Sequence, residues 1–259
     1  MGIEVHPDWW KDLFDEIYLL TDARSVCSEE ITRREVDMIL KLLPLSADQR
    51  ILDLCGGHGR HSLELCSRGF SDITVLDYSQ YLIEHGQACA QEHGHPITFI
   101  RSDARDTKLS SESFDDVLVL GNSLGYHPDP ISDHQILSEA RRVLKPEGRL
   151  LLDVTNGASV KAKLTPKSWH EIDQDVVVCR EREMRENTVR TREMVLDKST
   201  GIIRDQTYCI RMYEPASLIS LIEDVGFKKI TAHTDFSPQK KPGDYGCMDH
   251  RMIITAQKI

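Results

Sequence analysis

The 259-residue sequence lacks most features of exported and membrane-spanning proteins. It has no run approaching the ~20 consecutive apolar residues of a membrane-spanning helix. Its first segment, MGIEVHPDWWKDLFDEIYLL, has acidic residues where a secretory signal has a basic start and an apolar centre. The seven cysteines include no Cys-x-x-Cys pair, and their odd number fits reduced thiols better than a disulfide framework. These absences predict a cytoplasmic protein with no disulfides and no membrane partner.

The chain also lacks an excess of positive charge. Its 32 Lys and Arg stand against 42 Asp and Glu, so the formal net charge is −10 at pH 7. Proteins that bind nucleic acid gain affinity by neutralising phosphates with basic side chains, and an acidic chain is poorly suited to this. A nucleic acid is therefore not expected as the main partner.

Between residues 50 and 154, short apolar runs alternate with longer segments of helical spacing. The runs are RILDLC, DITVLD, ITFIRS, DDVLVL and RLLLDV. Apolar strands that alternate with helices indicate a mostly parallel sheet with helices on both faces. We therefore predict an α/β, doubly wound fold with a core made of residues 50–164 and 214–259. A helix from Pro215 to Val225 and two closing strands complete this core.

Residues 1–49 lie outside the alternating pattern and are predicted to be helical. An aromatic-rich stripe runs from Trp9 to Leu19, and a second helix follows from Glu29 to Leu43, where Pro44 ends it. Such a stripe is explained either by a helix packed on the core or by a lid over a substrate pocket. We interpret the segment as an N-terminal helical lid or cap.

Residues 165–213 alternate polar and apolar side chains between turn compositions. This pattern predicts an antiparallel β insertion of about three strands within the core. The mixed-charge run REREMRE, Arg180–Glu186, is interpreted as a solvated strand face without a chemical role.

The stretch ILDLCGGHGRHS, residues 51–62, places three glycines between a predicted strand and a predicted helix. It allows a nucleotide-type loop, a metal site on Cys55, His58 and His61, or a plain tight turn. Neither the G-x-G-x-x-G spacing of dinucleotide sites nor the G-K-[ST] of phosphate loops is present. A zinc site would lack a fourth ligand, so we expect no metal.

Acidic residues end the next two predicted strands. Asp77 follows the glycine loop by about 20 residues, the position from which a carboxylate accepts hydrogen bonds from ribose hydroxyls. Asp103 ends the third strand. Together with the loop, these acids would line a cleft that suits a ribose and an adenine amine.

These motifs and their order resemble the class I S-adenosylmethionine-dependent methyltransferases, in particular the bacterial small-molecule type. The family pattern LDLxCGxGRHSLxLAxRG is matched by LDLCGGHGRHSLELCSRG, and the later motifs follow in family order as ITVLDYS, FIRSDAR, NSLGY, RRVLKPEGRLLLDVTN, RMYEPASLISLIEDVGF and DHRMIITAQK. The resemblance extends from residue 50 to residue 257. It implies a seven-stranded sheet with one antiparallel strand, S-adenosylmethionine as cofactor, S-adenosylhomocysteine as product, and a substrate cover built by residues 165–213.

The resemblance also implies which residues contact the cofactor. Loop residues would line its methionine part, the acids at the second and third strand tips and the residues after them would hold ribose and adenine, and the residues after the fourth strand would face the sulfonium. In chain order these are Asp53, Cys55, Gly56, Gly57, Gly59, Asp77, Tyr78, Asp103, Ala104, Gly121 and Asn122.

Four residues are candidates for the chemistry: His127, Tyr126, Tyr213 and Arg211. His127 or a tyrosine could remove a proton from the acceptor, although His127 could also be a solvated loop residue. Tyr213 and Arg211 would point into the cleft, although Arg211 could instead pair with an acid.

We expect direct methyl displacement onto a small-molecule acceptor through an N, O, S or C nucleophile, in a monomer or homodimer. The alternatives are a nucleic-acid or protein methyltransferase, or a non-catalytic subunit that binds S-adenosylmethionine.

Overall fold

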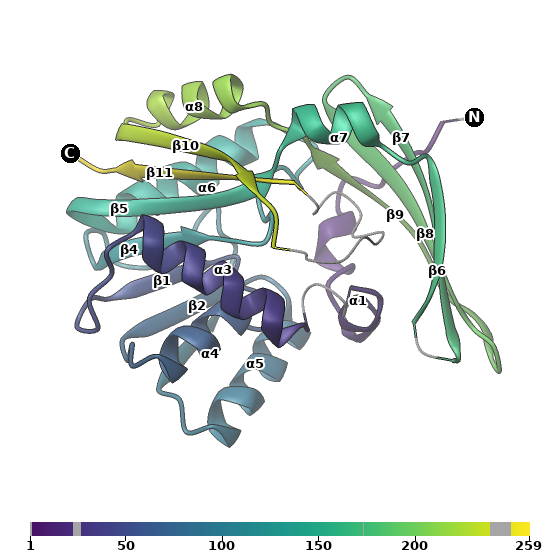
Figure 1. Cartoon of the computed structure of the whole chain (residues 1–259), viewed down its shortest axis with the longest axis horizontal. Helices are drawn as coiled ribbons and strands as arrows, with labels where there is room; N and C mark the ends of the chain where they lie inside the picture. The colour runs from purple at the N-terminus through teal and green to yellow at the C-terminus, as the bar shows by residue number, and fades with distance from the viewer. Residues whose placement is uncertain (1, 23–26, 173, 239–249) are drawn as a thin grey trace.

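The computed structural model describes residues 2–22, 27–172, 174–238 and 250–259. Its strands form one sheet of seven strands and a second sheet of four, with the N-terminal segment between them (Figure 1). None of the helices in these ranges is long and apolar enough to cross a membrane. The six cysteines in these ranges are free thiols, and Cys247 lies outside them.

The larger sheet has the strand order β10-β11-β5-β4-β1-β2-β3. Strands β3, β2, β1, β4 and β5 pair in parallel, and β11 runs antiparallel to both of its neighbours. The predicted doubly wound sheet with one antiparallel strand is confirmed. Its strands are β1 (Ile51–Leu54), β2 (Ile73–Asp77), β3 (Ile97–Arg101), β4 (Phe114–Val119), β5 (Leu144–Thr155), β10 (Lys228–Phe236) and β11 (Arg251–Gln257).

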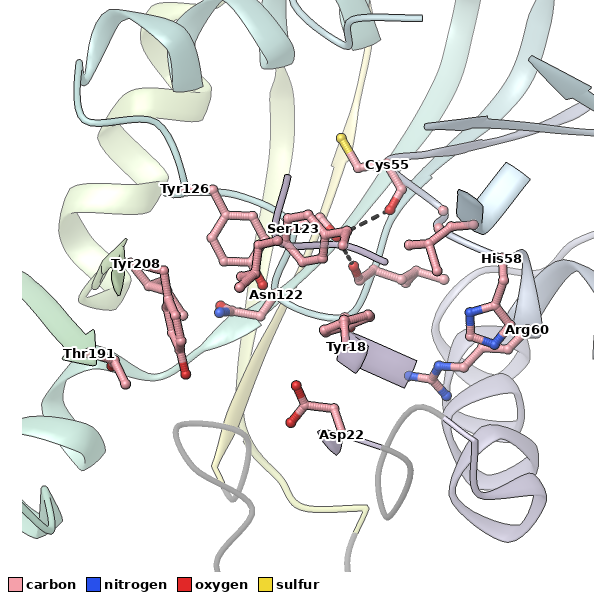
Figure 2. A pocket seen from close by; sticks show the side chains of 18 of the residues that line it. Tyr18, Asp22, Cys55, His58, Arg60, Asn122, Ser123, Tyr126, Thr191 and Tyr208 are labelled. Carbon is pink, nitrogen blue, oxygen red and sulfur yellow. Dashed lines mark hydrogen bonds between the residues drawn. The ribbon is translucent and has the colours of Figure 1, made fainter. Parts of the chain in front are cut away.

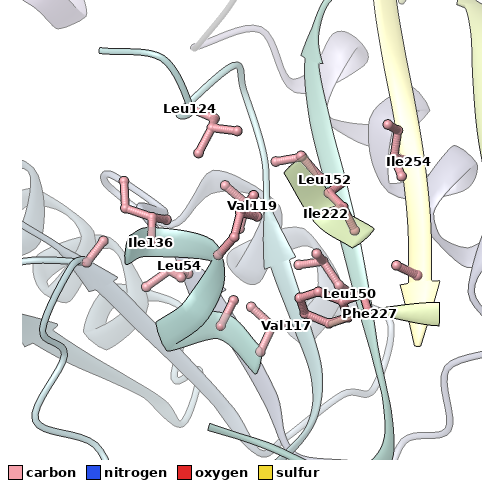
Figure 3. Packing of buried hydrophobic residues seen from close by; sticks show 14 of the residues in the cluster. Leu54, Val117, Val119, Leu124, Ile136, Leu150, Leu152, Ile222, Phe227 and Ile254 are labelled. Carbon is pink, nitrogen blue, oxygen red and sulfur yellow. The ribbon is translucent and has the colours of Figure 1, made fainter. Parts of the chain in front are cut away.

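Helices pack on both faces of the larger sheet because its central strands are apolar on both sides. On one face Ile136 and Ile222 pack against Val119 and Leu152 (Figure 3). On the other face a second cluster joins α3 and α4 to β1. These helices are α3 (Glu29–Leu42), α4 (Arg60–Ser67), α5 (Gln80–Glu92), α6 (Ile131–Val143) and α8 (Pro215–Asp224). A further helix, α7 (Gly157–Lys163), packs through Val160 against Val189 of the second sheet.

The N-terminal segment forms two short helices where the aromatic-rich stripe predicts continuous helix. These are the 3₁₀ helix η1 (Trp9–Lys11) and α1 (Glu16–Thr21). Asp15 interrupts the pattern because its carboxylate accepts hydrogen bonds from the backbone N–H groups of Ile17 (2.9 Å) and Tyr18 (3.1 Å). A carboxylate in this position caps a new helix instead of continuing an earlier one.

The predicted second helix is present as α3. Ser28 caps it by accepting a hydrogen bond from the N–H of Ile31, and the helix ends at Leu42, two residues before Pro44. Proline cannot continue a helix, so the stop signal works as predicted.

The second sheet has four antiparallel strands where three were predicted. The strand missed from the sequence, β6, is an edge strand of mixed composition, KSWHEI, whose Trp169 is 70% exposed. Edge strands need little apolar sequence because only one side pairs and much of the surface meets solvent. The strands are β6 (Lys167–Ile172), β7 (Val176–Arg185), β8 (Thr188–Asp197) and β9 (Gly201–Arg211).

The N-terminal segment lies between the two sheets (Figure 1). Trp9 and Leu13 pack against Cys209 of β9, while Ile17 packs against Val178 of β7. The segment and the second sheet therefore cover the edge of the larger sheet at which β1, β2 and β4 end.

Candidate functional site

Two adjoining pockets lie at that covered edge. The strand-tip pocket is lined by residues that follow β2 and β3. The inter-sheet pocket lies between the larger sheet, α1 and the second sheet, and Figure 2 shows Tyr126 and Tyr208 on one side of it and Arg60 on the other. The residues shared by both pockets are Phe14, Tyr18, Cys55, Gly57, Leu82, Gly121, Ser123 and Tyr126.

The glycine loop brings its backbone to the wall of both pockets. Cys55 (φ +60°) and Gly57 (φ +59°) adopt the left-handed conformation, and the N–H of Gly57 donates a 2.8 Å hydrogen bond to Asp77 Oδ2. A Cβ on Gly56 would lie 2.7 Å from the Asp53 carboxyl carbon, which is too close for any side chain. The loop therefore presents main chain where another sequence would place side chains.

Asp53 and Gly59, predicted to contact the cofactor, line neither pocket. Asp53 is fully buried behind the loop, where it accepts a 2.7 Å hydrogen bond from Ser62, and burial raises its pKa to about 6. Gly59 precedes α4 with φ +73°, and a Cβ there would lie 3.0 Å from the Phe99 ring. Both residues shape the loop from behind, because the turn faces the pockets with its other side.

The strand-tip pocket brings together Asp77, Tyr78, Asp103 and Ala104, as the sequence predicts. The Asp77 carboxylate is held by the glycine loop and by the N–H of Ser79 (2.9 Å).

Asp103 forms an ion pair with Arg105 (2.6 Å) at the same pocket. Burial alone would raise the pKa of Asp103, but the hydrogen bonds from Arg105 outweigh it and lower the pKa. This carboxylate is therefore ionised at neutral pH and can accept hydrogen bonds from a ligand.

His127 lies in the strand-tip pocket and does not line the inter-sheet pocket. Its ring packs edge-on against Trp10 at 4.5 Å between centroids, and Trp10 also packs against Tyr78 at 4.7 Å. Burial, aided by the charge of Arg105, lowers the pKa of His127 to about 4. The structure thus places this candidate base beside the aromatic wall near Asp103.

Tyr213 and Arg211 do not point into the cleft, and that expectation is wrong. The Tyr213 hydroxyl donates a 2.5 Å hydrogen bond to the buried Asp133 of α6, and Arg211 forms an ion pair with the same carboxylate. Asp133 also accepts a 3.0 Å hydrogen bond from the N–H of Gly125. Arg211 therefore pairs with an acid, and the cluster holds the loop after β4 from outside the pockets.

Besides His127, the loop after β4 supplies three predicted residues to the pockets. Gly121 (φ +67°) lines both, and no atom lies within 4 Å of the position its Cβ would take. Asn122 (φ +65°) lines the inter-sheet pocket and accepts a 2.8 Å hydrogen bond from the N–H of Thr155. Tyr126 belongs to the wall shared by both pockets.

A buried cluster of charged residues was missed by the sequence analysis. Glu35 of α3 forms ion pairs with Arg60 and with Arg251 of β11 (3.0 Å), and its carboxylate lies 2.9 Å from His61 Nε2. Arg251 also pairs with Asp153 of β5. The arginines and His61 belong to the recognised GRHS and HRMI motifs, but Glu35 lies in a helix without a motif, so only the fold identifies their partner.

Arg180 and Arg182 correct the interpretation of REREMRE as a solvated face. Both are 6% exposed and line the inter-sheet pocket. Arg180 donates a 2.7 Å hydrogen bond to Glu193 of β8, and Arg182 donates one of 2.9 Å to Ser168 of β6. Because strand side chains alternate in direction, the two arginines share the inner face with Val178, a signal present in the sequence.

Cys55, His58 and His61, which the sequence allowed as a metal site, have other neighbours in the structure. His61 is engaged with Glu35, and the His58 ring lies 5.8 Å from that of His85. Among the residues that the structure describes, no group of three or more His, Cys, Asp or Glu side chains is arranged to hold a metal ion.

Sequence comparisons relate the chain to methyltransferases. The profile of the methyltransferase-domain family matches residues 51–148. A putative methyltransferase of Bacillus subtilis, YqeM, is 29% identical over 154 residues, which are 59% of this chain and 62% of that protein. The chain thus spans less than two thirds of that relative's length. A glycine/sarcosine N-methyltransferase of Halorhodospira halochloris is 26% identical over 92% of this chain and 82% of its own length.

The fold has solved counterparts as well. The crystal structure of an S-adenosylmethionine-dependent methyltransferase from Clostridium acetobutylicum superposes with a TM-score of 0.72 over 93% of this chain and 96% of that one, at 14% identity. The motifs, the sheet order and the matched profile agree with one another. Residues 51–148 therefore belong to the methyltransferase-domain family, and the chain as a whole shares the fold of S-adenosylmethionine-dependent methyltransferases.

Proposed function

We propose that the chain binds S-adenosylmethionine across its two pockets and transfers the methyl group to a small-molecule acceptor by direct displacement. The observation that carries this proposal is the shared wall: the strand-tip pocket and the inter-sheet pocket meet at Gly57 and Gly121. A ligand with a nucleoside at one end and a charged amino acid at the other can lie across that wall.

The strand-tip pocket fits the nucleoside half of the cofactor. Asp77 would accept hydrogen bonds from the ribose hydroxyls, as acids at this strand tip do in related nucleotide-binding folds. Asp103 would accept from the adenine amine, and the aromatic wall of Tyr78 and Trp10 offers a flat apolar surface to the base. The missing side chains at Gly57 and Gly121 leave main chain facing the pocket, which is the fit that a closely held ligand requires.

The inter-sheet pocket fits the amino-acid half. Arg60, the first residue of α4, lines this pocket and would attract a carboxylate at the helix N-terminus. Glu35, which also lines it, would face an ammonium group. Because Glu35 is already paired with two arginines, both side chains are held in place before a ligand arrives.

The cofactor would supply a methyl group activated by the positive sulfur to which it is attached. The protein is then required to align the acceptor and to exclude water. The N-terminal segment and the second sheet, which close over the pockets, are placed to do both. Relatives include an enzyme named for glycine and sarcosine, and a pocket that lies between two sheets likewise favours a small acceptor over a macromolecule.

The test has two measurements on the full chain. Isothermal titration with S-adenosylhomocysteine should show binding, and Asp77→Ala should weaken it ~100-fold, because a half-buried carboxylate bonded to the ligand and to the loop is lost. Unchanged affinity would remove Asp77 from the ribose site.

For transfer, cofactor carrying a ¹³C-methyl group is incubated with a cell extract divided by size. Label in the small-molecule fraction supports the proposal, whereas label confined to protein or nucleic acid contradicts it. Cofactor binding without any transfer would indicate a non-catalytic subunit.

A further inference from the structure

Five aromatic rings surround the place where the two pockets meet, and we call them the aromatic cluster. Trp9, Phe14 and Tyr18 come from the N-terminal segment, Tyr126 from the loop after β4, and Tyr208 from β9. Ring centroids lie 5.0 Å apart for Phe14 and Tyr18 and 5.6 Å apart for Phe14 and Tyr126. Trp9 lies 5.6 Å from Tyr126 and 5.7 Å from Tyr208.

The aromatic cluster suits positive charge. Aromatic rings carry negative partial charge on their faces and attract cations placed over them, most strongly where water is excluded. Burial raises the pKa of Tyr18 and of Tyr208, so both phenols stay protonated at neutral pH. Neither tyrosine is therefore prepared to act as a base.

The carboxylates of the inter-sheet pocket are already engaged by arginines. Asp22 and Glu193 pair with Arg180 at 3.2 and 2.7 Å, and Glu35 pairs with Arg251 at 3.0 Å. Each of these carboxylates accepts a hydrogen bond from its arginine. Burial alone would raise the pKa of Glu35, but Arg60 and Arg251 hold it well below its usual value. Within the described ranges, every carboxylate that lines this pocket is paired in this way.

The histidines of the same pocket are weak bases too. Burial lowers the pKa of His58 to about 3 and that of His61 to about 4. His61 is engaged with Glu35, and the His58 ring packs beside that of His85. In the inter-sheet pocket, rings that tolerate a cation therefore lie beside histidines of lowered pKa and carboxylates already bound to arginines.

We propose that the acceptor is a small amine, methylated on its nitrogen, and that the aromatic cluster stabilises the positive charge which arrives there. This inference rests on the proposed function. The nitrogen lone pair forms the new N–C bond, the electron pair of the broken S–C bond stays on sulfur, and the ammonium product releases its proton to solvent. A neutral amine needs no base for this step, whereas a hydroxyl or a carbon acceptor must lose a proton to the protein.

The test uses two probes of the same shape that differ in charge. Choline carries a quaternary ammonium, and 3,3-dimethylbutan-1-ol carries a neutral tert-butyl group in its place. Each is titrated by calorimetry into the full-length protein saturated with S-adenosylhomocysteine. We expect choline to bind ~10-fold more tightly than the alcohol, because only the cation gains from the rings.

Variants separate the ring from the hydroxyl and from general effects on the protein. Tyr208→Leu should abolish the preference for choline, while Tyr208→Phe, which keeps the ring, should retain it. Trp169→Leu is the matched control, because this aromatic residue is 70% exposed on the edge strand β6 and lines neither pocket. Thermal melting and affinity for S-adenosylhomocysteine, measured first, show whether each variant is folded and loaded.

Three results would overturn the inference. These are equal binding of the two probes by the wild-type protein, a preference for choline that survives Tyr208→Leu, and a transferred ¹³C-methyl group found on oxygen or carbon. The preference for choline together with label on nitrogen supports it. Failure to bind S-adenosylhomocysteine is a different outcome, because it contradicts the proposed function on which the inference rests.

Discussion

The larger sheet and the second sheet face the same pockets with different kinds of surface. The larger sheet presents loops at its strand tips, in which glycines and acids fix the backbone, as at Gly57 and Asp77. The second sheet presents side chains from strand interiors, such as Arg182, Thr191 and Tyr208. Loops of fixed backbone suit a ligand that is the same in all related proteins. Side chains of a strand can be substituted without disturbing the backbone hydrogen bonds of the sheet, so they suit a ligand that differs between proteins.

This difference suggests a division of labour in which the larger sheet holds the cofactor and the second sheet, with the N-terminal segment, selects the acceptor. Strand-tip loops are the usual place for ligands in open α/β sheets. Variants on the two sides should therefore alter different measured quantities.

Asp133→Ala should have the largest effect, because Asp133 joins the two regions. It pairs with Arg211, the last residue of β9, and accepts a hydrogen bond from Tyr213, which follows that strand. It also accepts a hydrogen bond from the N–H of Gly125 in the loop after β4. Removing one partner of a buried ion pair costs about 3–5 kcal/mol of unfolding free energy. Urea denaturation measures the loss, and Asp48→Ala, at an exposed position, is the control. Equal stability of the two variants would show that the contacts of Asp133 do not stabilise the fold.

Gly56→Ala tests the larger-sheet side. The new methyl group would lie 2.7 Å from the Asp53 carboxyl carbon, so the loop must move and lose its fit to the cofactor. We expect S-adenosylhomocysteine to bind ~100-fold more weakly by calorimetry, a change of about 2.7 kcal/mol. Gly94→Ala is the control for a glycine replaced away from the site: Gly94 lines neither pocket, and no atom lies within 4 Å of the added methyl. If both variants bind alike, crowding at the loop is not the cause.

Arg182→Met tests the second-sheet side. Arg182 reaches the inter-sheet pocket from the second sheet, whereas Arg60 and Asp77, proposed to hold the cofactor, belong to the larger-sheet side. Its loss should therefore lower kcat/KM for the acceptor ~10-fold, or about 1.4 kcal/mol, with cofactor affinity nearly unchanged. Steady-state kinetics and calorimetry on the same preparation measure both quantities. A large loss of cofactor affinity would break the proposed division.

His127→Gln should have the smallest effect and decides between two roles for this residue. Because His127 lies beside Trp10 in the strand-tip pocket, we expect kcat to be retained and cofactor affinity to fall only a few-fold. A large fall in kcat with a changed pH–rate profile would restore His127 as a base.

The same variant has a signature in stability. The unfolded chain protonates this histidine below its ordinary pKa of 6.5, whereas the folded chain does so only below about 4. Between these values the unfolded state binds more protons, so the free energy of unfolding falls as pH falls. His127→Gln should make that decline shallower, as measured by denaturation at pH 7 and pH 4.5.

Part of the site could be predicted from sequence because it is local. Cys55, Gly56 and Gly57 belong to one turn, and Asp77 and Asp103 end strands whose apolar runs are visible in the chain. In a parallel sheet those ends lie along one edge, so their meeting in one pocket follows from the alternation of strands and helices.

Other features of the site could not be predicted from the sequence, because they depend on which side of a turn or strand faces the pocket. Asp53 and Gly59 lie in the same motif as Gly57, yet the turn directs them away from the pockets. Tyr213 and Arg211 were expected in the cleft, but both bind the carboxylate of Asp133, which lies about 80 residues earlier in the chain.

The class of fold and the resemblance to methyltransferases could be predicted from the chain alone, since hydrophobic periodicity and an ordered set of motifs are properties of the sequence. The aromatic cluster and the cluster around Glu35 were decided only by the tertiary structure. Their members come from the N-terminal segment, the larger sheet and the second sheet, and no local pattern links residues as distant as Glu35 and Arg251. They meet because burying apolar surface brings the two sheets and the N-terminal segment together, and buried charges then require partners.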